Sequence, residues 1–179
     1  MARVNYDYKG KFLLTASARA DGSSRFGENN KFGFFPSAAF GWNLHQEEFL
    51  KNSSFFDQLK FRVSYGSIGN QAITPYQTQA LLGRTSYAWD NTAAFGYRPN
   101  TIGNPDLRWE SSSTFNTGFD FSILKNKIFG SIEYYITNTS DLLAPQPLPN
   151  STGFGGFTTN IGETQNRGIE LSLSTLNVE

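Results

Sequence analysis

The stretch that decides the fold is FNTGFDFSILKNKIFGSIEYYI, residues 115–136. Apolar residues alternate with polar or small ones on both sides of the LKNK segment, residues 124–127. Successive side chains of a β-strand point to opposite faces, so each half of the stretch has one apolar and one polar face. The four residues between the halves have the composition of a tight turn. The stretch therefore predicts an antiparallel hairpin of two strands.

The same period of two recurs along almost the whole chain. It is found in residues 4–8, 12–19, 37–44, 59–65, 115–123, 128–136 and 169–174. We therefore predict an all-β fold, an antiparallel up-and-down sheet of about seven long strands. Alternation defines two faces but does not say which solvent each face meets. It fits both a soluble sandwich with its apolar faces inside and a barrel with its apolar face in lipid.

The links between these strands favour the barrel. In chain order they are short (8–11), long (21–30), medium (45–56), long (67–106), short (124–127) and long (144–157). Outer-membrane barrels have short periplasmic turns at one end and long loops at the other, whereas a sandwich has no reason to sort its links. The segments 108–124 and 127–143 also predict strands of about 17 residues, well beyond the usual 5–6.

Composition excludes several classes of function. The 15 Lys and Arg balance the 15 Asp and Glu, so no basic face points to nucleic acid. The absence of Cys excludes disulfides and thiolate chemistry, and the single His45, expected as a solvated surface residue, argues against a histidine metal site or a Ser-His-Asp triad. The sequence opens on a strand pattern and not on a signal peptide, so we expect an internal piece of a longer secreted chain.

Several strings resemble the C-terminal barrel of the SusC/RagA family of TonB-dependent outer-membrane transporters. In chain order they are YKGKFLLTAS (8–17), RADGSSRFG (19–27), GFFPS (33–37), LKFRVSYG (59–66), GNQ (69–71), GNPDLRWE (103–110), NTSDLL (138–143), and NIG (160–162) with NRGIEL (166–171). Each string alone is common. Together they follow the order of the family and cover nearly the whole chain.

The resemblance implies what the chain belongs to and does. Residues 1–179 would be a partial barrel domain, with the plug domain, the TonB-contacting box and the last barrel strands outside it. The family's barrel has about 22 strands and a plugged lumen. Its implied function is TonB-dependent import of a glycan or other large nutrient across the bacterial outer membrane. Its implied partners are a SusD-like surface lipoprotein, the TonB complex, the glycan or peptide substrate and outer-membrane lipid, with no cofactor and no enzymatic reaction.

The long link 67–106 supplies the candidate substrate-binding residues. Aromatic rings stand in it among Asn, Gln, Thr and Arg, and aromatic faces stack on sugar rings or apolar peptide side chains. The residues proposed to bind substrate are Tyr87, Trp89, Phe95 and Tyr97, with Tyr76 a fifth ring in the same link. The alternative is that these rings pack the link against its neighbours or against a lid protein.

Other readings of the residues stay open at this point. The principal alternative is a soluble β-sandwich that binds carbohydrate through the same aromatic link. A glycoside hydrolase could use two of Asp120, Glu133 and Glu170, although a lumen wall balanced by Lys60, Arg62 and Arg19 fits these carboxylates better. Residues 21–30 could hold Ca²⁺, but they lack EF-hand spacing, and a hydrogen-bonded hairpin tip fits them better. Pro36 should mark a β-bulge.

Overall fold

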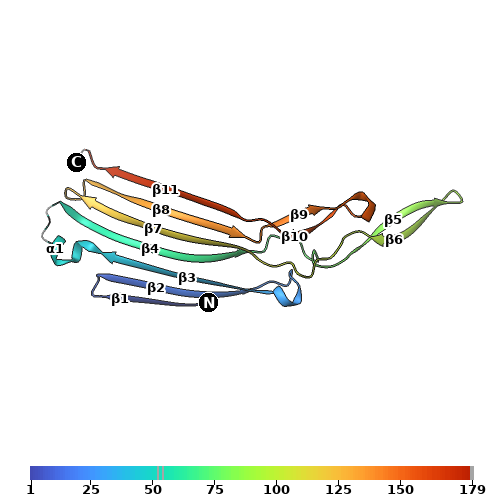
Figure 1. Ribbon diagram of the computed structural model, residues 1–179, viewed down its shortest axis with the longest axis horizontal. Helices are drawn as coiled ribbons and strands as arrows, with labels where there is room; N and C mark the ends of the chain where they lie inside the picture. The colour runs from blue at the N-terminus through green and yellow to red at the C-terminus, as the bar shows by residue number, and fades with distance from the viewer. Residues whose placement is uncertain (52, 54, 178–179) are drawn as a thin grey trace.

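The computed structural model describes residues 1–51, 53 and 55–177, and its main element is a curved seven-stranded antiparallel sheet (Figure 1). Neighbouring strands follow chain order, so the predicted up-and-down sheet is confirmed. Its strands are β1 (Ala2–Tyr8), β2 (Phe12–Gly22), β3 (Phe32–Asn43), β4 (Phe56–Asn70), β7 (Glu110–Ile123), β8 (Ile128–Ser140) and β11 (Thr164–Thr175).

Two small hairpins and four short helical segments complete the described chain. The hairpins pair β5 (Leu82–Trp89) with β6 (Thr92–Pro99), and β9 (Leu143–Pro147) with β10 (Gly156–Asn160). The helical segments are η1 (Glu28–Asn30), η2 (Leu44–Gln46), α1 (Glu48–Lys51) and η3 (Asn150–Thr152). None of the helices in the described residues has the length and hydropathy that crossing a membrane requires.

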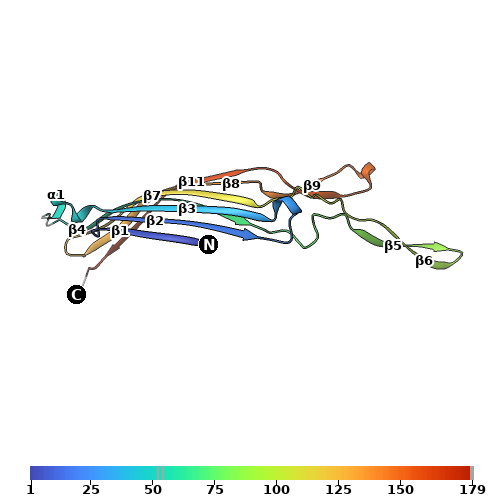
Figure 2. The same cartoon turned by 90° about the horizontal axis from the view of Figure 1, so that it is seen from below.

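The links are sorted between the two ends of the sheet, as their lengths predict. The β1–β2 and β7–β8 turns and the link that contains α1 lie at one end (Figure 1). Both small hairpins extend beyond the opposite end, and Figure 2 shows the same arrangement from below. Lys9 and Gly10 of the first turn have φ values of 55° and 65°, the conformation of a type I′ hairpin turn.

The strand register aligns the apolar residues into rows across the sheet. One row contains an apolar or aromatic residue from every strand: Tyr8, Phe12, Trp42, Phe61, Phe119, Ile132 and Leu171. The adjacent row on the opposite face contains Arg62, Glu133 and Glu170. A slip of one residue at any strand would exchange its two faces, so this register fixes which side of the sheet is apolar.

The apolar face is open to its surroundings. Ile132 is 48% exposed and Leu171 is 70% exposed, far more than core residues would be. Among the described strands none covers this face, because the small hairpins lie beyond the end of the sheet (Figure 2). A sandwich needs a second sheet to bury such a face. The alternative of a soluble β-sandwich is therefore wrong for this part of the chain.

Three local predictions need correction. The strands expected over 108–124 and 127–143 are shorter, at 14 residues for β7 and 13 for β8. The Arg108 N–H donates to Asn160 of a link, whereas Leu143 pairs with Asn160 in the β9–β10 hairpin and its N–H donates to the Glu110 side chain of β7. Pro36 causes no bulge: it pairs with Ala18 in regular register, and the pairing of β3 with β4 begins only at the next residue. His45 is half-buried, and its Nδ1 lies 3.3 Å from the Leu59 carbonyl oxygen.

A small core forms where the long links leave the sheet. Phe26, Ile73 and Leu107 come from three stretches far apart in sequence and are 2%, 4% and 0% exposed. The Trp109 ring packs on Phe26 at 5.2 Å between ring centroids. This core gives the long links a fixed base.

Close backbone approach at this core predicts a strong effect of one methyl group. A Cβ at Gly27 would overlap the Pro105 carbonyl oxygen, which is backbone and has little freedom to move. Gly27→Ala should therefore destabilise the base of the links by about 1–3 kcal/mol, as overpacking does. Faster proteolysis within residues 67–106 of the purified protein would report the change.

Gly66→Ala is the matched control, because its Cβ would lie 3.4 Å from the Ser37 Cβ, an ordinary contact distance. Equal proteolysis of the Gly27→Ala and Gly66→Ala variants would contradict the prediction.

Candidate functional site

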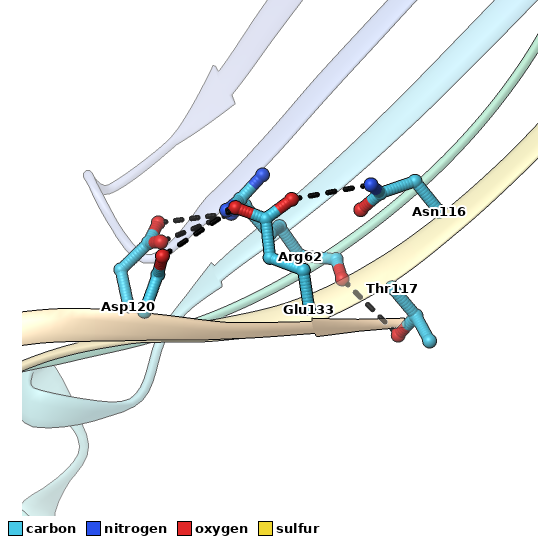
Figure 3. Close-up of polar contacts among 6 residues, drawn as sticks. Arg62, Asn116, Thr117, Asp120 and Glu133 are labelled. Carbon is cyan, nitrogen blue, oxygen red and sulfur yellow. Dashed lines mark hydrogen bonds and ion pairs between the residues drawn. The ribbon is translucent and has the colours of Figure 1, made fainter. Parts of the chain in front are cut away.

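The polar face of the sheet carries an ion-pair network centred on Arg62. Arg62 donates from Nε to Asp120 at 3.1 Å and from Nη2 to Glu133 (Figure 3). Asn116 donates to the second oxygen of Glu133 at 3.2 Å. Arg62, Asp120 and Glu133 stand on three neighbouring strands, so β4, β7 and β8 are joined by side chains as well as by their backbones.

The network bears on whether Asp120 and Glu133 could serve as the carboxylate pair of a glycoside hydrolase. One guanidinium binds both Asp120 and Glu133, an arrangement that balances charge on a wall and leaves neither carboxylate free to flank a substrate bond. Arg62 therefore balances these carboxylates as predicted. The same prediction is wrong for Arg19, which pairs with Asp21 of its own strand at 2.7 Å. Residues two positions apart on β2 lie on the same face and close together. Arg19 therefore pairs with this local carboxylate and not with a carboxylate on a distant strand.

A second charged cluster joins the short links at the other end. Glu47 accepts from Lys11 Nζ at 3.0 Å and from Trp42 Nε1 at 3.1 Å. The hydrogen bond from Lys11, followed by that from Trp42, holds the pKa of Glu47 below its usual value. The cluster attaches the β1–β2 turn to the link between β3 and β4.

The four predicted substrate-binding residues lie on the β5–β6 hairpin, but on opposite faces of it. Tyr87 and Trp89 share one face, their ring centroids 6.2 Å apart in an edge-to-face arrangement. Phe95 and Tyr97 share the other face. All four rings are more than half exposed, so neither pair packs the hairpin onto the main sheet.

The two aromatic faces of this hairpin differ in what already occupies them. The Arg84 guanidinium lies 3.7 Å from the centre of the Phe95 ring, a cation–π contact. The Tyr87–Trp89 pair has no charged group stacked on it among the described residues. The face with Tyr87 and Trp89 is thus the more open surface for an external partner.

The fifth aromatic residue of the link lies elsewhere. Tyr76 borders a pocket of about 270 Å³ where the bases of the β5–β6 and β9–β10 hairpins meet. Sequence reasoning groups Tyr76 with the hairpin rings because all five share one link. The pocket needs β9 and β10 for its other wall, and no local pattern in the sequence indicates that the two links touch.

Hydrogen bonds fix the links to one another at this end. Asn160 donates to the Arg108 carbonyl at 2.8 Å and accepts from the Arg108 N–H at 3.0 Å. Arg108 also pairs with Asp141 at 2.6 Å. Asn104 accepts from the Asp106 N–H at 3.2 Å, a side-chain hydrogen bond typical of a turn. The links therefore leave the sheet from a rigid base.

Comparison with known proteins gives a consistent answer. The family model described as TonB dependent receptor-like, beta-barrel matches residues 1–177. A TonB-dependent receptor of Formosa agariphila is 42% identical over 173 residues, which cover 97% of this chain and 16% of that protein. The TonB-dependent receptor SusC of Bacteroides thetaiotaomicron is 36% identical over 178 residues, 96% of this chain and 18% of SusC.

Solved structures agree with the sequence relatives. A chain of the RagAB peptide importer in its closed-closed state matches with a TM-score of 0.90 and 34% identity, over 99% of this chain and 19% of that one. The siderophore receptor PirA from Pseudomonas aeruginosa matches with a TM-score of 0.61 at 14% identity, a likeness of fold alone. The chain spans less than a fifth of the length of SusC and of the matched RagAB chain.

The Glu47 cluster predicts a pH-dependent contribution to stability. Because the folded-state pKa of Glu47 is lowered, its stabilising effect is present above the unfolded value and is lost as pH falls through the folded value. Glu47→Gln should lower the thermal unfolding midpoint at pH 7. The difference from the native protein should shrink as the pH falls and vanish below the lowered folded-state pKa of Glu47, where the native carboxyl is also protonated.

Glu48→Gln is the control, because Glu48 makes no ion pair with any described residue. A deficit of Glu47→Gln that stayed constant from neutral to acid pH would contradict the prediction.

Proposed function

This chain belongs to the TonB dependent receptor-like β-barrel family, and from that premise we propose that it forms part of the wall of an outer-membrane importer of a glycan, peptide or other large nutrient. TonB-dependent receptor barrels reside in the bacterial outer membrane. Residues 1–179 are in this proposal one segment of a barrel domain in a longer receptor, whose plug and closing strands lie outside them.

The observation that carries the proposal is the open apolar face backed by an ion-paired polar face. From Phe115 to Ile123, β7 advances about 27 Å along its axis at ~3.4 Å per residue. For strands tilted by roughly 40° this is about 20 Å across a membrane, comparable to the roughly 25 Å apolar band of such barrels. On β4, β7, β8 and β11, the apolar face becomes polar towards the long links, in a row formed by Ser67, Ser113, Asn138 and Gln165. This change supports an outer boundary of the lipid zone there.

The polar face supports passage of substrate and not chemistry on it. Its carboxylates Asp120 and Glu133 are bound by Arg62, and the proposed importer forms and breaks no covalent bond in its substrate. Energy for transport comes from outside the barrel wall, through TonB acting on the plug. The role of this chain is to line the path and to hold the outer links.

The β5–β6 hairpin is the proposed contact for substrate or for a SusD-like lipoprotein that covers the barrel. It extends farthest from the sheet (Figure 1) and carries Tyr87, Trp89, Phe95 and Tyr97 exposed. Exposed aromatic pairs of this size are unusual on a surface without a partner, because they leave apolar area in water. The open Tyr87–Trp89 face is the first candidate and the Phe95–Tyr97 face the second.

The assignment of faces predicts opposite outcomes for the same substitution at adjacent positions of β8. Ile132→Arg in the whole receptor should impair assembly in the membrane, because Arg near the bilayer midplane costs about 2–4 kcal/mol on the lipid face. Ser131→Arg should be tolerated, because Ser131 lies on the polar face directly across from Asp120. The membrane assembly of both variants is measured by receptor abundance and by heat-modifiable electrophoretic mobility in outer-membrane preparations. Equal abundance of the two variants would reject the assignment of faces.

Because its rings are exposed, substitutions on the β5–β6 hairpin should affect function and not assembly of the receptor. Replacing Tyr87 and Trp89 together with Ala should leave receptor abundance unchanged and weaken uptake or lipoprotein binding roughly tenfold, since one stacked ring contributes on the order of 1 kcal/mol and 1.4 kcal/mol is a factor of ten. The Phe95→Ala and Tyr97→Ala double variant compares the opposite face and should have the smaller effect.

Loss of the Tyr87–Trp89 variant from the membrane would show that these rings are structural. Normal uptake and lipoprotein binding by both double variants would remove the hairpin from the functional site.

A further inference from the structure

The pocket between the bases of the two small hairpins has the features of a ligand site. Its volume of about 270 Å³ lies just under the roughly 300–1,000 Å³ of sites for drug-sized ligands. Such a space fits one unit of a polymer and not a whole chain. Eleven residues line it: Thr74, Pro75, Tyr76, Gln77, Leu81, Thr101, Ile102, Pro145, Gly156, Phe157 and Thr158.

The walls of this pocket are joined by hydrogen bonds before any ligand arrives. Gln77 accepts from the Thr74 N–H at 2.9 Å and from the Thr74 hydroxyl at 3.1 Å. The Gln77 amide donates across the pocket to the Thr158 hydroxyl on β10. Asn104 in turn donates to the Thr158 carbonyl at 3.0 Å. A ligand therefore meets a wall whose side chains are already ordered, which lowers the entropy lost on binding.

Tyr76 is held at the pocket in an unfavourable backbone conformation. Its φ is 65°, in the left-handed region that bulky side chains rarely adopt, and its side chain is 65% exposed. Strained residues of this kind cluster at binding sites, where the surrounding structure maintains them. The strain presents an aromatic ring beside the pocket without burying it.

The chemistry of the lining specifies what the pocket can hold. None of its eleven residues is charged. Tyr76, Phe157 and two prolines offer apolar faces. The Thr74 and Thr101 hydroxyls donate to Gln77 and to the Gln79 carbonyl, so toward a ligand they offer acceptor oxygens. Because Thr158 accepts from Gln77, its own O–H proton remains to be donated. Apolar surface beside uncharged hydroxyls matches a sugar ring, whose C–H groups form an apolar face and whose rim is polar.

We infer that this pocket binds one uncharged sugar unit of a neutral glycan. A peptide fits less well, because its charged ends and side chains find no opposite charge in the lining. An acidic glycan would bring a carboxylate or sulfate that the pocket cannot pair, at a high desolvation penalty. The inference deepens the proposed import function and rests on it, because the bound sugar is taken to belong to the imported substrate. Binding of the sugar can be measured separately from import.

The test is a glycan-array screen with the whole receptor in detergent, carrying neutral and acidic oligosaccharides, followed by calorimetry with the strongest neutral ligand. Tyr76→Gly removes the ring while easing the backbone, and should weaken the dissociation constant about tenfold, the contribution of one stacked ring. Thr158→Val keeps the shape but removes the hydroxyl, and should weaken binding about two- to tenfold. Phe154→Ala, on the same link but outside the lining, should bind normally.

Each possible result of the binding experiments either supports or overturns the sugar site. Neutral glycans retained by the native receptor and lost by the Tyr76 and Thr158 variants support the inference. Retention of no neutral glycan, or of acidic glycans in preference, overturns it, as does capture of the tripeptide Ala-Leu-Ala that the same variants weaken. Neutral-glycan binding at full strength in both variants places the sugar elsewhere and also overturns it.

The proposed function fails by a different result. A receptor that assembles in the outer membrane but imports no nutrient by a TonB-dependent route would refute it, whatever the pocket binds. Conversely, TonB-dependent uptake of a peptide without any neutral-glycan binding would leave the import proposal intact and remove only the sugar site.

Discussion

Antiparallel hydrogen-bond register is the constraint on which the rest of this structure depends. Because the side-chain period of a strand is two, the register decides for each residue whether it meets the apolar or the polar face. Apart from one irregularity between Phe56 and Gln58 of β4, the seven strands pair in regular register. This register collects Phe61, Phe119 and Ile132 into one row, and brings Arg62 between Asp120 and Glu133 on the reverse side. The apolar face and the ion-pair network are thus two consequences of one arrangement of backbone hydrogen bonds.

This dependence explains how much of the fold the sequence could predict. The alternation in residues 115–136 is local, so it predicts the β7–β8 hairpin without any long-range information, and the sorted link lengths then indicate which ends of the strands lie together. Strand ends are less predictable because they depend on remote partners. Arg108 leaves the ladder for Asn160, a residue of another link, and no period in the sequence encodes that choice.

The candidate site likewise combines features that the local sequence predicts with features that depend on remote residues. The Tyr87, Trp89, Phe95 and Tyr97 rings could be predicted as exposed, but their separation onto two faces follows from the turn at Asp90 and Asn91, whose φ values are 50° and 58°. A two-residue Asp-Asn turn between short alternating runs indicates a β-hairpin. Counting odd and even positions outward from this turn on each strand is therefore enough to assign the four rings to two opposite faces. The pocket at Tyr76 had no comparable signal, because Thr158 and Phe157 come from a different link.

A rigid base for the long links also has a thermodynamic consequence for recognition. Contacts made by a freely moving loop are offset by the entropy lost when the loop is ordered, roughly 1–2 kcal/mol per backbone residue. The buried Phe26, Ile73 and Leu107, the Arg108–Asp141 ion pair and the bridge from Gln77 to Thr158 order the link bases during folding instead. Binding energy from the exposed rings and the pocket is then available for affinity. The buried residues that never touch a ligand therefore help to determine how tightly the exposed ones can hold it.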